Sequence, residues 1–253
     1  MSVLCLIPEK VVILGVEKQK IHNSVFIYNM TNYQIVIPVR GGSKRFHRKN
    51  IALLDNIPLI AHSIKFGLEN KIKANVFVNS DDDEILNISK KFGANVVKRP
   101  LELATDTTPT VEVLKYQIEY FEKNNIPCDA VILLQATNPI RPRGIVEDAV
   151  KVFESNTTKS LVSYSLLNKK FGTIKQNRFI PSNYLPGQRM QDIEKYYFEN
   201  GLIYITDIKS IKLGKIITDD AYPYIVDDLC TNIDIDEPND LILAEAILNV
   251  LKR

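Results

Sequence analysis

A glycine pair flanked by cations follows the first strand-like apolar run, in the segment IPVRGGSKRFHRKN. Glycine lets backbone N–H groups approach an anion closely, and Arg40 and Lys44 place positive charge on either side of Gly41 and Gly42. The spacing differs from GxxxxGK[ST] and from GxGxxG, so neither the P-loop nor the dinucleotide-binding fingerprint applies. The segment predicts a phosphate-binding loop of another kind, and the alternatives are a solvated basic turn or a nuclear-localisation cluster.

Two aspartates, Asp234 and Asp236, alternate with isoleucines in NIDIDEP. An extended chain places both carboxylates on one side and turns Ile233 and Ile235 into the core. Converging carboxylates repel each other unless a cation joins them, and Mg²⁺ together with phosphate oxygens suits such hard oxygen ligands. We therefore expect a magnesium site, with a loop that caps the last helix as the alternative.

Other polar groups have simpler interpretations. The acidic run at residues 81–84 is interpreted as a helix start, with Ser80 or Asp81 as the cap and the remaining carboxylates favoured by the helix dipole. The three histidines have no ligand spacing, and no Ser/His/Asp or Cys/His nucleophile set is apparent. Gln135 and Thr137, in LLQATNP, follow a buried-looking run and should emerge at its end.

Apolar strand-like runs alternate with helical patterns from residue 35 onward. The expected strands are Ile35–Val39, Asn75–Asn79, Asn95–Val97, Ala130–Leu134, Ser160–Ser165 and Leu202–Thr206. The expected helices cover about 58–70, 83–92, 108–124, 142–155 and 238–252. This alternation implies βαβ units and a mostly parallel sheet with both faces covered. Ligands of such sheets bind beyond the carboxyl ends of the strands, where the glycine loop lies.

The composition fits a single α/β domain without a general affinity for polyanions. With 32 basic and 30 acidic residues among 253, the formal net charge is +2, so no global field draws the protein to nucleic acid or membrane. The three cysteines lack paired spacing, which favours a reduced cytoplasmic setting. No apolar run approaches the roughly 20 residues that span a bilayer, and Pro8, Glu9 and Lys10 interrupt any secretory signal.

Two regions depart from the alternation. Residues 1–29 precede the first strand, and Met30 stands where a compact domain of residues 30–253 could begin, so residues 1–29 are expected to be either an extension or an added strand. Residues 166–200 are rich in polar and turn-forming residues, which is typical of a hairpin arm that leaves the sheet and reaches a second subunit.

The glycine loop and five later segments resemble, in order and spacing, the sugar-acid cytidylyltransferases that make CMP-N-acylneuraminate. The later segments are VNSDDDEI, KRPLELATDTTPT, VILLQATNPIR, QRMQDIEKYYFENGLIYI and NIDIDEPNDLILAEAIL. The resemblance covers about residues 33–252. It implies a Rossmann-like sheet of the nucleotide-sugar (GT-A-like) transferase type, with a dimerisation arm at about 166–195 that completes the site of the other subunit in a homodimer.

The resemblance also implies a reaction, in which CMP passes from CTP to the anomeric hydroxyl of a nine-carbon α-keto sugar acid with Mg²⁺ as cofactor. The residues implied to bind the nucleotide are Arg40, Gly41, Gly42, Ser43, Lys44, Asn50, Arg99 and Thr110. Those implied to bind the sugar acid are Gln135, Thr137, Arg189, Gln191, Asn200 and Tyr204. Catalysis is assigned to Arg40, Lys44 and Gln135, together with the metal ligands Asp234 and Asp236.

Several alternatives stay open. Arg189 has the right chemistry to bind a carboxylate bidentately, or it is a surface arginine on a polar arm, and Tyr204 is either in the pocket or in the core. Arg45 stands where the sialic acid enzymes usually carry glycine, which favours the CMP-pseudaminate branch. CMP-legionaminate and CMP-Kdo synthesis are further alternatives, although CMP-Kdo synthetases have a loop resembling RYGSTR rather than RGGSKR. A homologue that binds CTP without turnover is the alternative from another class.

Overall fold

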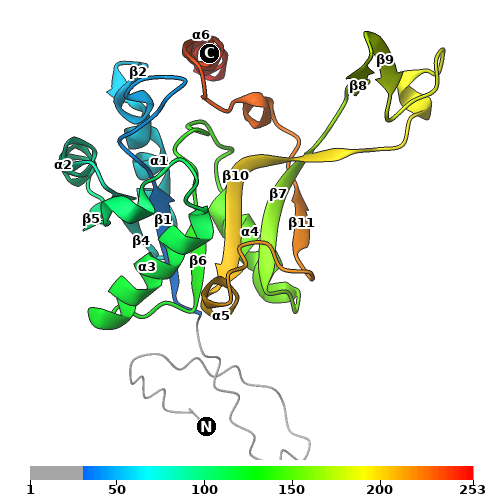
Figure 1. Ribbon diagram of the computed structural model, residues 1–253. Coiled ribbons are helices and arrows are strands. Elements are labelled where there is room, and N and C mark those ends of the chain that lie inside the picture. The colour runs from blue at the N-terminus through cyan, green and yellow to red at the C-terminus, as the bar shows by residue number, and fades with distance from the viewer. Residues whose placement is uncertain (1–30, 253) are drawn as a thin grey trace, which may run out of the picture.

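A mostly parallel seven-stranded sheet, in the order β11-β7-β10-β6-β1-β4-β5, forms the centre of the molecule (Figure 1). This computed structural model describes residues 31–252, so the expected extension at residues 1–29 and Met30 lie outside the described residues. The strands of the sheet are β1 (Tyr33–Pro38), β4 (Asn75–Ser80), β5 (Asn95–Lys98), β6 (Ala130–Leu133), β7 (Ser160–Leu166), β10 (Tyr197–Asp207) and β11 (Tyr222–Ile225). All neighbouring strands run parallel except β10, which is antiparallel to β6 and β7.

Helices cover both faces of this sheet (Figure 1). They are α1 (Leu59–Leu68), α2 (Asp83–Lys91), α3 (Thr110–Lys123), α4 (Ile145–Ser155), α5 (Ile208–Lys212) and α6 (Pro238–Leu251). Ile35 and Ile37 of β1 pack in the cluster that includes α1, α2, α4 and α6, whereas Val36 packs in the cluster of α3 and α5. Successive strand residues face opposite sides, so both must be apolar when both faces are covered. The predicted fold class is confirmed.

The sequence located the six predicted strands and five long helices but not every element. The edge strand β11 contains Pro223, which cannot donate to a sheet ladder and therefore weakens the strand signal. The start of α2 was assigned to the wrong residue: Asp82, not Ser80 or Asp81, accepts hydrogen bonds from the backbone N–H groups of Glu84 and Ile85. Asp81 therefore does not cap α2.

The predicted excursion between β7 and β10 projects from the sheet (Figure 1). It contains the hairpin of β8 (Gly172–Lys175) and β9 (Arg178–Pro181) and the short helix η3 (Met190–Asp192). Apolar side chains on it are exposed, among them Ile174, Phe179 and Leu185. Its role in dimerisation stays a prediction. Among the described helices, none has both the length and the apolar composition that a membrane crossing requires.

A bulge in β10 brings the strand against the loop that follows β6. The register between β10 and β7 shifts between Glu199 and Tyr204, and Gly201 within the bulge has a φ of +72°. A Cβ at Gly201 would lie 2.5 Å from Asn138 Oδ1 and 2.9 Å from Gln135 Oε1. Glycine is therefore required at position 201 for two reasons: the backbone is left-handed there, and two side chains approach it closely.

We expect Gly201→Ala to lower the free energy of unfolding by about 2–4 kcal/mol, because left-handed strain and a steric clash add. Gly144→Ala is the matched control, since Gly144 also has a positive φ of +79° but nothing within 4 Å of its missing Cβ. It should cost about 1 kcal/mol. Urea unfolding of both variants measures the difference, and equal losses would show that the Gly201 contacts are unimportant.

Candidate active site

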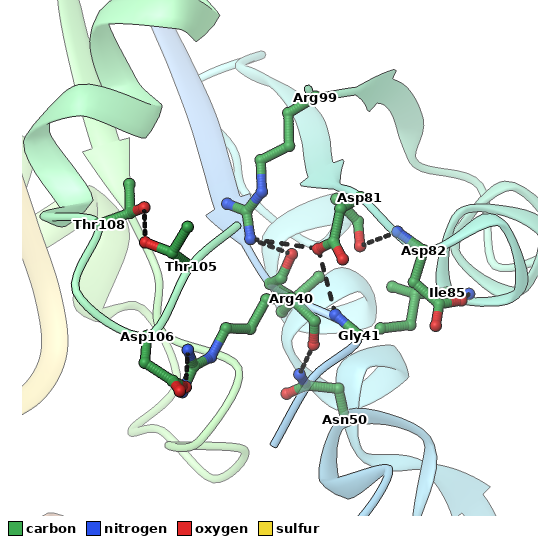
Figure 2. A network of polar contacts seen from close by, with 12 residues as sticks. Arg40, Gly41, Asn50, Asp81, Asp82, Ile85, Arg99, Thr105, Asp106 and Thr108 are labelled. Carbon is green, nitrogen blue, oxygen red and sulfur yellow. Dashed lines mark hydrogen bonds and ion pairs between the residues drawn. The ribbon is translucent and has the colours of Figure 1, made fainter. Parts of the chain in front are cut away.

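The glycine loop leaves the carboxyl end of β1 and is held from behind by an ion pair (Figure 2). Arg99 donates to the carbonyl of Val39 at 2.9 Å and lies 3.5 Å from Asp81. Asp81 in turn accepts from the backbone N–H of Gly41 at 3.2 Å. A Cβ on Gly41 would lie 2.6 Å from Asp82 Oδ2, so only glycine fits there. Arg99 and Gly41 therefore shape the loop from its rear rather than line the space in front of it.

A cleft of about 560 Å³ opens in front of this loop. Of the predicted nucleotide-binding residues, the cleft is lined by Arg40, Ser43, Lys44, Asn50 and Thr110. Gly41, Gly42 and Arg99 are not among its lining residues. The side chain of Asn50 is buried and donates to the Arg40 carbonyl at 2.9 Å, so its amide fixes the loop at the cleft wall.

Carboxylates pair with the cations of the cleft in two groups. In the first, Arg40 lies 2.5 Å from Asp106 Oδ1, and Lys44 forms an ion pair with Oδ2 of the same carboxylate. The hydrogen bonds from Lys44 and Arg40 lower the pKa of Asp106. Asp106 comes from the ATDT segment before α3, and its carboxylate takes the position that an anionic ligand of Arg40 and Lys44 would need.

The second group surrounds Asp236. Arg45 lies 2.6 Å from Asp236 Oδ2, and Lys49 lies 2.8 Å from Oδ1. These two cations hold the pKa of Asp236 below its usual range although partial burial opposes the shift. The Lys49 side chain is 11% exposed and that of Arg45 is 64% exposed, so Lys49 forms a buried part of the cleft wall and Arg45 a largely solvent-exposed part. Sequence reasoning missed Lys49, which stands beside Asn50 in the RKN triplet, and left Arg45 unexplained.

The predicted alternation around Asp234 and Asp236 is present. Ile233 and Ile235 are buried at 1% and 0% exposure, and both aspartates line the cleft. Among residues 31–252, no three His, Cys, Asp or Glu side chains gather as a ready metal cage. The donor set is thus two carboxylates beside a cationic cleft, which fits a hard divalent cation that takes its remaining ligands from phosphate and water.

A second cavity of about 1000 Å³ adjoins the first, and Gln135 and Asp234 line both. Its other lining residues include Asn200, Tyr204 and the carboxylates Glu199, Asp227 and Asp228. The Tyr204 hydroxyl donates to Glu199 at 3.2 Å, and burial raises the pKa of Tyr204.

Other predicted sugar-side residues are placed differently. Thr137 lines the first cleft rather than the second cavity. Asn200 borders the second cavity, but its amide is occupied by Ser163, Ser165 and the Leu202 N–H. Its visible role is therefore to fix the β10 bulge.

Two predicted sugar-binding residues lie on the projecting arm. Arg189 pairs with Asp192 at 2.8 Å, and its side chain is 71% exposed. Neither Arg189 nor Gln191 lines either cavity of the same chain. The fold therefore brings Gln135 together with most of the residues predicted to bind phosphate and metal within one chain, but it does not add the arginine predicted to bind the sugar carboxylate.

The buried Arg141 is a second residue that sequence reasoning missed. Unlike Arg99, which has Asp81, Arg141 forms no ion pair with a carboxylate in the described part of the chain. Burial lowers its pKa to about 9. A buried arginine has to be satisfied by hydrogen bonds, and one of those that it donates ends on Gln135.

Comparison with known proteins points to one enzyme class. The profile of the cytidylyltransferase family matches residues 34–227. A CMP-N,N'-diacetyllegionaminic acid synthase of Legionella pneumophila is 33% identical over 225 residues, which is 85% of this chain and 95% of that protein. An N-acylneuraminate cytidylyltransferase of Streptococcus agalactiae is 29% identical over 197 residues, 75% of this chain but 47% of that longer protein. A pseudaminic acid cytidylyltransferase of Campylobacter jejuni is 32% identical over 183 residues, 69% of this chain and 78% of that one.

Among solved structures, the CMP:2-keto-3-deoxy-manno-octonic acid synthetase complexed with CTP superposes with a TM-score of 0.67. The match covers 87% of this chain and all of that one, at 19% identity. At this identity the likeness concerns the fold, and it agrees with the observed sheet.

We expect Asp106→Asn to strengthen binding of inorganic triphosphate several-fold at low salt, because it frees Arg40 and Lys44 and removes a repelling charge. Asp83→Asn makes the same charge change at a carboxylate that pairs with Lys98 outside the cleft, and it should leave affinity nearly unchanged. Isothermal titration calorimetry compares them. Weaker binding by Asp106→Asn would mean that the carboxylate organises the cations rather than competes for them.

Proposed function

The chain belongs to the cytidylyltransferase family, and we propose that it transfers CMP from CTP to the anomeric hydroxyl of a nine-carbon α-keto sugar acid. The observation that carries this proposal is the junction of two cavities at Gln135 and Asp234. One cavity is cationic and suits a triphosphate, and the other has room for a sugar. Transfer requires the acceptor hydroxyl next to the α-phosphorus, which is the arrangement that two adjoining cavities provide.

The cationic cleft supplies most of the proposed chemistry. Arg40, Ser43 and Lys44 hold the phosphates, and Lys49 faces the same space from a fixed position. Preorganised cations stabilise the charge that spreads over the α-phosphoryl group and the departing pyrophosphate. When CTP enters, phosphate oxygens replace the Asp106 carboxylate as the partner of Arg40 and Lys44. These two cations are therefore paired with an anion both without and with CTP.

Asp234 and Asp236 are the proposed Mg²⁺ ligands. When bound, Mg²⁺ neutralises phosphate charge and lowers the pKa of the attacking hydroxyl, which suits a site without an obvious strong base. Asp236 must then release at least one of its two cations. Arg45 is the more exposed partner and is the one free to turn toward the phosphates, while Lys49 stays buried at the wall. Arg45, which stands where the sialic acid enzymes usually carry glycine, would then contact the pyrophosphate end of CTP.

The sugar acid is proposed to be of the N-acylneuraminate type. The legionaminate, N-acylneuraminate and pseudaminate enzymes all match at 29–33% identity, so their acids form the natural test set. Kdo is the weaker candidate, because its synthetase is similar to this chain in fold at only 19% identity. Pyrophosphate release from CTP with each acid ranks these substrates. Binding of CTP without release for any acid would favour the non-catalytic alternative.

We expect Asp234→Asn and Asp236→Asn each to lower turnover by roughly 100-fold or more, because each removes a charged ligand that the transition state requires. Asp219→Asn, which changes an exposed carboxylate that pairs with Lys215, should keep wild-type turnover. The assay follows Mg²⁺-dependent and sugar-acid-dependent pyrophosphate release. Near-normal CMP-sugar formation by either aspartate variant would refute the metal assignment.

We further propose a homodimer in which the arm of one subunit carries Arg189 to the sugar cavity of the other. The carboxylates of that cavity support this arrangement, as do the excess of basic residues and the exposed apolar side chains of the arm. Arg189→Ala and Asp236→Asn would each be poorly active alone, yet their mixed dimer would hold one intact site. Co-refolding equal amounts should restore about a quarter of wild-type turnover. A monomeric mass in solution, or no restoration in mixed dimers, would contradict the proposal.

A further inference from the structure

Arg141 connects three separate elements from a buried position behind the two cavities. Its Nε donates to the Leu202 carbonyl of β10 at 2.8 Å, and its Nη1 donates to Ser63 Oγ of α1 at 3.0 Å. Its guanidinium also lies over the Phe66 ring, 5.4 Å from the centroid. Arg141 is 7% exposed, and in residues 31–252 all its hydrogen-bond acceptors are uncharged. A buried charge without a counter-ion is costly, so a core that needed only filling would use an apolar residue.

The remaining hydrogen bond of Arg141 reaches the active site. Its Nη2 donates to the Gln135 carbonyl at 2.6 Å. Ser63 Oγ donates to the same oxygen at 3.2 Å, and the Asn138 N–H approaches it at 3.4 Å. Three donors thus converge on one carbonyl, and the charged donor forms the shortest bond, as expected for a charge-assisted hydrogen bond.

Gln135 lies where the two cavities meet, so its position matters to the proposed chemistry. It lines both cavities, and its side-chain oxygen packs against Gly201 of the β10 bulge, 2.9 Å from where a Cβ would stand. Its backbone follows β6, beyond the last paired strand residue, so the sheet ladder does not hold it. The hydrogen bonds at its carbonyl and the packing against Gly201 fix it instead.

We propose that Arg141 is a positioning residue that fixes Gln135 at the junction of the two cavities and so sets the affinity for the sugar acid. The inference rests on the proposed function, in which Gln135 orients that acid. Arg141 itself lines neither cavity. Lysine cannot replace this guanidinium, because a single ammonium group cannot reach β10, α1 and the Gln135 loop with the same fixed fork.

The other buried arginine of the site provides a matched control. Arg99 is 5% exposed and donates to the Val39 carbonyl behind the glycine loop, as Arg141 donates to the Gln135 carbonyl behind the sugar cavity. Arg99→Lys and Arg141→Lys therefore make the same chemical change at equivalent depth. If each arginine positions its own loop, the first should raise KM for CTP and the second KM for the sugar acid.

The test measures both KM values for wild type, Arg141→Lys, Gln135→Ala and the double variant. Losing the contact between Gln135 and the sugar acid should raise KM for the sugar acid about tenfold, both in Arg141→Lys and in Gln135→Ala. The double variant should match Gln135→Ala alone, because Arg141 acts through Gln135. KM for CTP should change less than about twofold in Arg141→Lys. Ser63→Ala, which removes a weaker donor to the same carbonyl, should show a smaller rise in KM for the sugar acid.

Amide hydrogen exchange gives a readout that does not require turnover. In Arg141→Lys, exchange should accelerate at residues 135–138 and stay unchanged at residues 40–44. If the wild-type enzyme makes no CMP-sugar from any acid, the proposed function is wrong. Hydrogen exchange at residues 135–138 still shows whether Arg141 holds Gln135 in place, because it does not depend on turnover. Additive KM effects in the double variant, or equal acceleration of exchange in both loops, would overturn the role of Arg141.

Discussion

Cations that face one cleft repel one another until an anion arrives, and the carboxylates of the same cleft relieve that repulsion. Arg40 and Lys44 share Asp106, while Arg45 and Lys49 share Asp236. Without these pairs, desolvation and like-charge repulsion would disfavour a loop with so many basic residues close together. The pairs involve side chains that are partly exposed, such as Arg45 and Lys44, so an incoming anion can compete for these cations.

A second set of interactions holds the loops from behind. Arg99 with Asp81 fixes the glycine loop, and Arg141 fixes the loop that follows β6. Loops beyond the ends of strands have no ladder to satisfy their carbonyls, and buried carbonyls require partners. Guanidinium groups suit this task because each donates in several fixed directions at once.

The sheet topology explains why the two cavities meet. β10 enters antiparallel between β6 and β7, and its bulge turns Gly201 toward the end of β6. Asn138 then bridges the carbonyls of Asn200 and Ile233, which joins β10 to the segment that carries Asp234. Residues far apart in the sequence thus share one wall, and the arm that leaves between β7 and β10 starts from the edge of the second cavity.

Features that depend on local periodicity and local chemistry could be predicted from the amino-acid sequence. Continuous apolar runs located six strands, because a strand buried on both faces has no polar side, and alternation of aspartate and isoleucine placed both carboxylates toward the cleft. The pairing of distant charged residues, in contrast, became visible in the folded structure. Arg45 pairs with Asp236 across 191 positions, and Arg141 reaches Leu202 across 61. The structure also gives the neighbouring aspartates different roles: Asp82 caps a helix, whereas Asp81 accepts a hydrogen bond from Gly41. Arg189 lies away from the cavities of its own chain. Such partners are selected by three-dimensional proximity and burial, which one-dimensional spacing does not encode.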